Sequence, residues 1–279
     1  MTATTSLRPA QTRAGTAYRV TGLGVLRSEW AKFWSLRSSW ITLGISLLLL
    51  IAIGLVAASR YSPQLASEQG KHHLIPVGGN AVAIALAGIT LAQLATGVLG
   101  VLFTAGEYST GMIRSTLTAV PTRLPVLWSK IAVFGVTALV LGTAGAVVAF
   151  LGGEHFLAGQ RIALTLSSSG VLRCLAAAGG YLSLVAVIGM ALGALARSVA
   201  GGITALIGGL TLLPLLANLL PANWADDVSP YLPGNAGDAM FALTRDSSTL
   251  SPGAGLAVFA GWAALLLALA AWRLARTDA

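Results

Sequence analysis

The sequence predicts an all-α integral membrane protein with six transmembrane helices, an N-terminal amphipathic elbow helix and two cytoplasmic termini. Composition is the first observation, since 56% of the 279 residues are hydrophobic and only 9% are charged. Mean hydropathy is the second, at +0.81. Soluble domains carry about 25% charged residues, and disordered chains combine low hydrophobicity with high charge. The composition therefore excludes an ordinary water-soluble enzyme and a disordered chain.

Six uncharged apolar stretches are the third observation. A spanning helix needs about 20 apolar residues, because the hydrocarbon core is about 30 Å thick. The stretches that meet this length are 40–58, 77–103, 131–151, 174–196, 199–220 and 255–272. The first stretch is too long, and lies too far along the chain, for the apolar region of a signal peptide. We divide the chain into a disordered tail (1–22), an elbow helix (23–39) and a six-span domain (40–276).

Basic residues set the orientation, because Lys and Arg accumulate in cytoplasmic loops. With the N-terminus inside, 12 of the 17 basic residues fall in cytoplasmic segments and 5 fall outside. Both termini are therefore expected in the cytoplasm. The net charge of +8 is then explained by basic residues in the cytoplasmic segments, and it does not indicate a nucleic-acid partner.

An amphipathic helix precedes the first span. Its apolar stripe has the spacing i, i+4, i+7, i+8 and consists of Leu26, Trp30, Phe33 and Trp34. The polar residues expected on the other side are Arg27, Ser28, Glu29, Lys32 and Ser35. Such a helix lies in the membrane interface, with its cations toward anionic lipid. It is either an anchor alone or an elbow helix that also contacts a cytoplasmic partner.

The cytoplasmic loop between the second and third spans covers residues 104–130. Ser109 and Thr110 are expected to cap a short helix over 112–119, which Pro121 ends. Pro125 is suited to the first turn of the next helix. The segment is semi-apolar, whereas simple linkers are flexible and polar. Its composition favours a shaped surface that docks on another protein.

Small residues recur at four-residue spacing in several spans, which lets helices approach closely. The positions singled out for helix packing are Gly189, Gly193, Gly201 and Gly209. They serve either packing among the six spans or a dimer face. Pro214 is expected to kink the fifth span. Only Arg197 and Ser198 join the fourth and fifth spans, which predicts a tight antiparallel pair.

Ionisable groups are missing from the predicted spans, although ion-coupled carriers usually need them there. Gln93 and Asn218 are the strongest polar groups at depth, and each is expected to form an interhelical hydrogen bond. No catalytic constellation, metal site or phosphate-binding loop stands out. His72, His73 and His155 fit no known ligand spacing. We expect no enzyme activity and no cofactor on this chain.

Two segments resemble the permease subunits of ABC-2 type transporters, actinobacterial members in particular. They are LRSEWAKFWSLRS, which begins at Leu26, and FTAGEYSTGMIRSTLTAVPTR, which begins at Phe103. The order of elbow, six spans and a loop between spans two and three is also similar. The resemblance implies a plasma-membrane export permease, a second permease subunit (homo- or heterodimer) and a partner ATPase that binds ATP and Mg. By position, the ATPase-coupling residues would be Glu107, Tyr108, Gly111, Arg114, Pro121 and Arg123.

The elbow residues Glu29 and Lys32 would lie near the same ATPase. An alternative function is a non-transporting membrane scaffold, immunity protein or sensor that binds a cytoplasmic partner through the same loop. An ion-coupled carrier is a third possibility, which the uncharged spans disfavour. Neither the substrate nor the role of the long connection 221–252 follows from the sequence.

Overall fold

The computed structural model describes residues 21–62, 79–111, 123–217, 219, 227–244 and 249–276, where every regular element is a helix. Within these ranges six segments are long and apolar enough to cross a membrane. They are α2 (Arg37–Ser59), α5 (Ile89–Ser109), α7 (Arg123–Leu157), α8 (Val171–Ala196), Val199–Ala217 and α13 (Pro252–Arg276). The prediction of a six-span, multi-pass membrane protein is confirmed at the level of helix length and composition.

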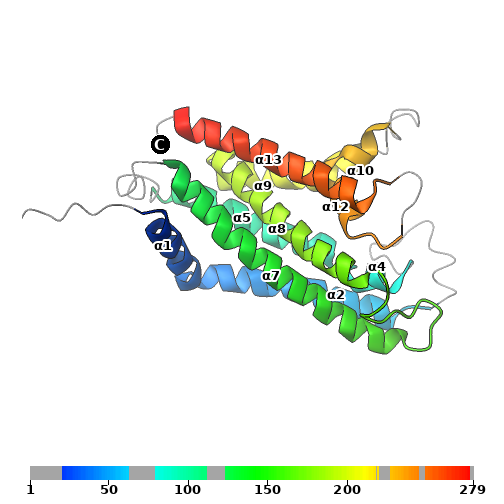
Figure 1. Ribbon diagram of the computed structural model, residues 1–279. Helices are drawn as coiled ribbons and strands as arrows, with labels where there is room; N and C mark the ends of the chain where they lie inside the picture. The colour runs from blue at the N-terminus through cyan, green and yellow to red at the C-terminus, as the bar shows by residue number, and fades with distance from the viewer. Residues whose placement is uncertain are drawn as a thin grey trace, which may run out of the picture.

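The long helices form an elongated bundle, and helix α1 (Gly22–Ser35) lies across one end of it (Figure 1). The C-terminal end of α13 lies at the same end of the bundle. Helix α8 packs against α5, α7, α9 (Val199–Ile207) and α13, and so occupies the centre. Helices α5 and α8 are the most buried of the six segments, whereas Val199–Ala217 and α13 are the least buried. The bundle is therefore built around the α5–α8 pair.

The second span differs from the expected continuous helix over 77–103. A short helix α4 (Ala81–Ala85) comes first, capped by the Asn80 side chain, which accepts a hydrogen bond from the Ala83 amide at 3.0 Å. The chain then breaks at residues 86–88, and α5 runs on to Ser109. A Cβ atom at Gly88 would overlap the backbone of α2 at Leu49 and Leu50. Because only glycine allows this approach, the break is packed directly against the first span.

Helix α7 is longer than the expected span over 131–151. Its 35 residues correspond to about 50 Å at 1.5 Å per residue, against a hydrocarbon core of about 30 Å. Part of α7 therefore extends beyond the hydrocarbon core, or the whole helix is strongly tilted. Pro125 lies in its first turn, as the sequence predicts.

Two of the four predicted packing glycines lie inside the bundle. A Cβ atom at Gly189 would overlap the carbonyl oxygen of Gly97, and one at Gly193 would overlap Thr104. The Thr104 hydroxyl donates a hydrogen bond to the Met190 carbonyl at 3.0 Å, across the same contact. The interpretation as internal packing therefore holds for this pair, which joins α8 to α5.

The prediction of internal packing does not extend to Gly201 and Gly209. No atom lies within 4 Å of a Cβ atom at Gly209, and one at Gly201 would meet only Ala196 and Ser198 of its own turn. The glycine that packs from this segment is Gly202, whose Cβ atom would lie 2.6 Å from Val101 of α5. Of the two alternatives for Gly201 and Gly209, packing among the six spans does not apply, and a dimer face stays a prediction, because regular spacing alone does not show which face of a helix meets the bundle.

The fifth span has three parts: α9 (Val199–Ile207), a π-helical turn η1 (Gly208–Leu212) and α10 (Leu213–Ala217). The Leu213 amide bonds to the Gly208 carbonyl, five residues back. Pro214 follows at once and has no amide hydrogen to donate, so the helix interior is disturbed where a kink was expected. A Cβ atom at Gly234 would lie 2.7 Å from the Pro214 ring, which places the following connection against this turn.

The described part of the connection 221–252 folds back onto the bundle. It contains a short 3-10 turn η2 (Ser229–Tyr231) and α12 (Pro233–Met240). The Trp262 indole of α13 donates to the Tyr231 carbonyl at 3.0 Å, and α12 packs against α13. Beneath α12, the Tyr181 hydroxyl donates to the Gln93 side-chain oxygen, which confirms the expected interhelical hydrogen bond of Gln93. Asn218 lies outside the described residues.

Candidate functional site

Helix α1 is short and sharply bounded. The Thr21 hydroxyl accepts a hydrogen bond from the Gly24 amide at 3.3 Å, which caps the first turn. Leu36 is extended, and α2 starts at the next residue. The buried residues of α1 are Val25, Glu29 and Phe33, spaced by four, so this face meets the bundle.

The predicted apolar stripe is only partly correct. Phe33 is fully buried, but Trp30 and Trp34 are about half exposed. Glu29, placed by the sequence on the polar side, is 1% exposed. That prediction was wrong, because an amphipathic pattern assumes that charges face water. Here two lysines neutralise the carboxylate inside the protein.

Four charged side chains form a buried network where α1, α5 and α7 meet. The Lys130 ammonium of α7 lies 2.8 Å from Glu29 Oε2 of α1 and 2.7 Å from Glu107 Oε1 of α5. The Lys32 ammonium of α1 lies 2.8 Å from Glu29 Oε1 and 3.4 Å from Glu107 Oε1. Two acids and two bases balance to zero net charge.

Burial makes this network sensitive to the loss of any member. The side chains of Glu29, Glu107 and Lys130 are 1%, 8% and 4% exposed, and Lys32 is 32% exposed. An ion taken out of water is costly unless it is paired, so removal of one partner typically destabilises by about 3–5 kcal/mol. Glu107 Oε2 is buried and accepts no hydrogen bond from the described residues. The second oxygen of this carboxylate therefore has acceptor capacity that the described residues do not use.

The pKa of Lys32 reflects its position in the network. Burial acts to lower it, but the hydrogen bond to Glu29 and the attraction of Glu107 outweigh burial and raise the pKa above its ordinary value of 10.5. Lys32 is therefore charged throughout the physiological range.

An aromatic cluster packs against the buried charge network. The Phe33 ring lies 5.8 Å from each of the rings of Trp40, Phe103 and Phe134, and meets Phe103 edge-on at 84°. The Lys130 ammonium lies 4.5 Å from the centre of the Phe103 ring, a favourable cation–π distance. This cluster joins α1, α2, α5 and α7 at one end of the bundle.

A second contact fixes the end of α5 to the turn between α8 and α9. The guanidinium of Arg197 lies 5.4 Å from the centre of the Tyr108 ring. Arg197 adopts a left-handed conformation (φ 53°), and Ser198 caps α9 by accepting from the Gly201 amide. The Arg273 guanidinium of α13 donates to the Leu195 carbonyl nearby. The predicted tight α8–α9 pair is thus confirmed and tied to two other helices.

The predicted coupling loop is described only at its two ends. Ser109 and Thr110 both donate to the Gly106 carbonyl, at 3.0 and 2.9 Å, and so close the end of α5. Gly111 takes a left-handed conformation (φ 71°), which favours glycine. Arg114, Pro121 and the expected helix over 112–119 lie outside the described residues. Arg123 starts α7, with no description of its side chain.

The network therefore sits at both roots of this loop. Glu107 lies near the end of α5, close to the first residue of loop 104–130, and Lys130, in the second turn of α7, is its last residue. Both are tied to Glu29 of α1, so a displacement of either root acts on the same cluster. As for metals, the described residues hold no group of three or more His, Cys, Asp or Glu side chains suited to one. His72 and His73 lie outside them.

No protein-family model matches this chain, and no curated protein matches it.

Lys130 is the member of the charge network that the sequence interpretation missed. It was placed at the end of the loop without a partner, whereas it bridges two acids, one of them 101 residues away. One signal was available. The sequence places Glu107 at the end of one predicted span and Lys130 at the start of the next, so both side chains were expected at the same depth.

Proposed function

We propose that this chain is the membrane-spanning permease subunit of an ATP-driven (ABC) transporter, an exporter whose ATPase is a separate subunit. It pairs with a second permease copy in the plasma membrane, with both termini in the cytoplasm. Helix α1 is its interfacial elbow. The loop 104–130 receives the ATPase, and Arg114 and Arg123 supply positive charge to it.

One observation supports this proposal most: Lys130 bridges Glu29 of α1 and Glu107 of α5 inside the protein. A partner that moves the loop moves the end of α5 and the start of α7. Because ion pairs in a desolvated site resist separation, α1 follows the same motion. The two ends of the loop, α1 and the aromatic cluster around Phe33 then move together between two positions. Gating requires such a two-state element.

The turn at Arg197 extends this element toward the centre of the bundle. Its cation–π contact with Tyr108 joins α5 to α8 and α9. A displacement at the loop is therefore transmitted to the most buried pair of spans, α5 and α8.

Reconstitution tests the function. The chain is purified from its native membrane with bound proteins and placed in vesicles loaded with a lipid-soluble extract of the same cells. Mass spectrometry then searches for compounds that cross the membrane only with Mg-ATP. The matched control carries an ATPase whose phosphate-loop lysine is replaced.

We expect at least one compound to move with ATP and none to move with the control. A bound ATPase with no ATP-dependent movement would instead favour the scaffold or sensor function. Movement driven by a proton or sodium gradient without ATP would favour an ion-coupled carrier.

A further inference from the structure

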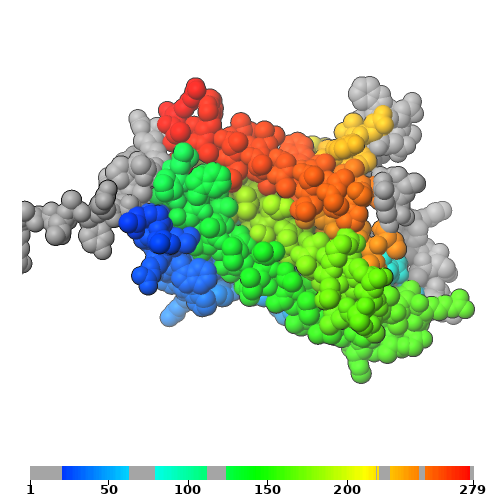
Figure 2. All heavy atoms as spheres, viewed as in Figure 1, coloured from blue at the N-terminus to red at the C-terminus, as the bar shows by residue number. Residues whose placement is uncertain are grey.

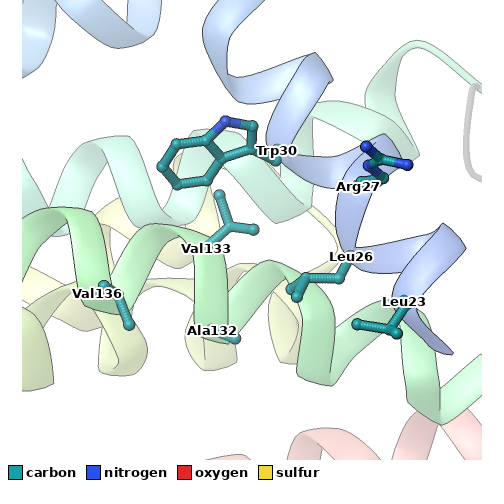
Figure 3. Close-up of a pocket in the computed structure, with 7 residues that line it drawn as sticks. All are labelled: Leu23, Leu26, Arg27, Trp30, Ala132, Val133 and Val136. Carbon is teal, nitrogen blue, oxygen red and sulfur yellow. The ribbon is translucent and has the colours of Figure 1, made fainter.

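A groove of about 480 Å³ lies between α1 and α7, separate from the buried charge network. Six of its seven lining residues are apolar and the seventh is a cation. They are Leu23, Leu26, Arg27, Trp30, Ala132, Val133 and Val136 (Figure 3). Figure 2 shows the two walls in contact, with α1 in dark blue against the green surface of α7.

The groove opens onto the outer surface of the bundle. Val136 at its α7 end is 55% exposed, and Val140, one turn further into the span, is 59% exposed. On the α1 side, Leu23 is 77% exposed and Trp30 is 45% exposed. In a membrane-spanning chain this continuous apolar exposure faces acyl chains rather than water.

Charge distinguishes one end of the groove from the other. Arg27 is the one charged residue among the described residues that line it. The nearest acid on α1, Glu29, lies on the buried face and is paired with Lys32 and Lys130. Among the described residues no acid pairs with Arg27, so the groove offers a cation next to an apolar channel, and the amphipathic Trp30 ring belongs to the same lining.

We propose that this groove binds one anionic phospholipid, with its phosphate at Arg27 and an acyl chain along Leu26, Ala132 and Val136. A guanidinium binds a phosphate by paired charge-assisted hydrogen bonds, and a tryptophan belongs at headgroup level. The proposal rests on the chain spanning a membrane and does not depend on transport.

Charge also decides against the other occupant that the chain offers. The N-terminal segment 1–20 carries Arg8, Arg13 and Arg19 and no acid. Like charges repel, so this segment complements Arg27 poorly, whereas an anionic headgroup complements it well.

The test measures lipid retention on the full-length chain. Delipidated protein in detergent is titrated with phosphatidylglycerol or with phosphatidylcholine of identical acyl chains, and native mass spectrometry counts the bound lipids. Arg27→Gln removes the headgroup contact and Val136→Trp fills the apolar end. Arg37→Gln and Val140→Trp are the matched controls, since both positions are exposed but outside the groove.

We expect wild type to bind one phosphatidylglycerol about tenfold more tightly than phosphatidylcholine, the scale of one charge-assisted contact. Arg27→Gln should abolish that preference, Val136→Trp should weaken both lipids, and the controls should match wild type. Glycerophosphoglycerol, which has the headgroup without acyl chains, should not displace the lipid.

Three results would overturn the proposal. The first is an unchanged preference in Arg27→Gln. The second is an equal loss in Arg37→Gln, which would show a general charge effect. The third is a gain of lipid on deletion of residues 2–20, which would show that the segment itself occupies the groove.

Discussion

The ammonium of Lys130 lies 2.8 Å from a carboxylate oxygen of Glu29, although 101 residues separate the two along the chain. Both side chains are almost fully buried, at 4% and 1% exposure. This pair fixes helix α1 to the start of α7, and Glu107 extends the link to α5. The N-terminal helix is therefore an integral part of the bundle at the end where loop 104–130 begins and ends.

Replacement of Lys130 by methionine should destabilise the protein strongly. The substitution keeps the apolar stem but leaves Glu29 and Glu107 with Lys32 alone. We expect a loss of about 3–5 kcal/mol, the usual cost of an uncompensated buried charge, measured by thermal unfolding in detergent. Arg37→Gln, at an exposed cation, should change little. Equal stability of the two variants would show that the network carries no such energy.

Helix α1 should detach from the bundle only at a strongly alkaline pH. The pKa of Lys32 is raised above 10.5 in the folded protein, so its contribution is complete below pH 10.5. It is lost as the pH rises through the folded value. A nitroxide attached at Ser28→Cys, in a Cys174→Ala background, should stay immobile at pH 7–10 and gain mobility above 10.5. Release at pH 8 or 9 would contradict the assignment, and Lys32→Met should remove this alkaline step.

Alanine at Gly189 should weaken the α5–α8 contact, whereas alanine at Gly209 should not. The first Cβ atom would overlap the Gly97 carbonyl, and the second would meet nothing within 4 Å. Overpacking of a tight contact costs about 1–3 kcal/mol, while removal of an unneeded helical glycine is neutral or slightly favourable. Thermal unfolding of the two variants side by side decides this, and an equal response would mean that Gly189 is not a packing residue.

Orientation is tested by labelling from one side of the membrane. Thr21 and His155 are both exposed and are assigned by the positive-inside rule to opposite sides. With Cys174→Ala as background, an impermeant maleimide should label His155→Cys in intact cells. It should label Thr21→Cys only after the cells are opened. The reverse pattern would place both termini outside and would leave loop 104–130 out of reach of a cytoplasmic ATPase.

Much of the fold could be predicted because the membrane imposes simple rules. Span length follows from bilayer thickness, and uncharged runs such as 40–58 fall within observed helices. Close helix contact at Gly189 and Gly193 could be predicted because glycine has no side chain to keep two helices apart. The break at Gly88 and the register of Gly202 could not be predicted, because both depend on which backbone lies opposite.

The candidate site was harder to predict for an electrostatic reason. Sequence patterns treat a charge as a sign of exposure, so Glu29 was assigned to the outer side of its helix. Its burial depends on Lys130, which lies beside Glu29 in the folded protein but 101 residues away in the sequence. Pairing at that distance leaves no periodic signature. The sequence placed Glu107 and Lys130 at the two ends of loop 104–130, but it did not predict their connection through α1.

The most direct test of the central claim is the amount of ATPase that remains bound to the purified chain. We predict that wild type retains an ABC-type ATPase and that Arg114→Glu with Arg123→Glu loses it, because both charges of the docking loop are reversed. Arg60→Glu, at the opposite end of α2, should retain it. Equal retention by the loop variant and wild type, or no ATPase with any of them, would contradict the account.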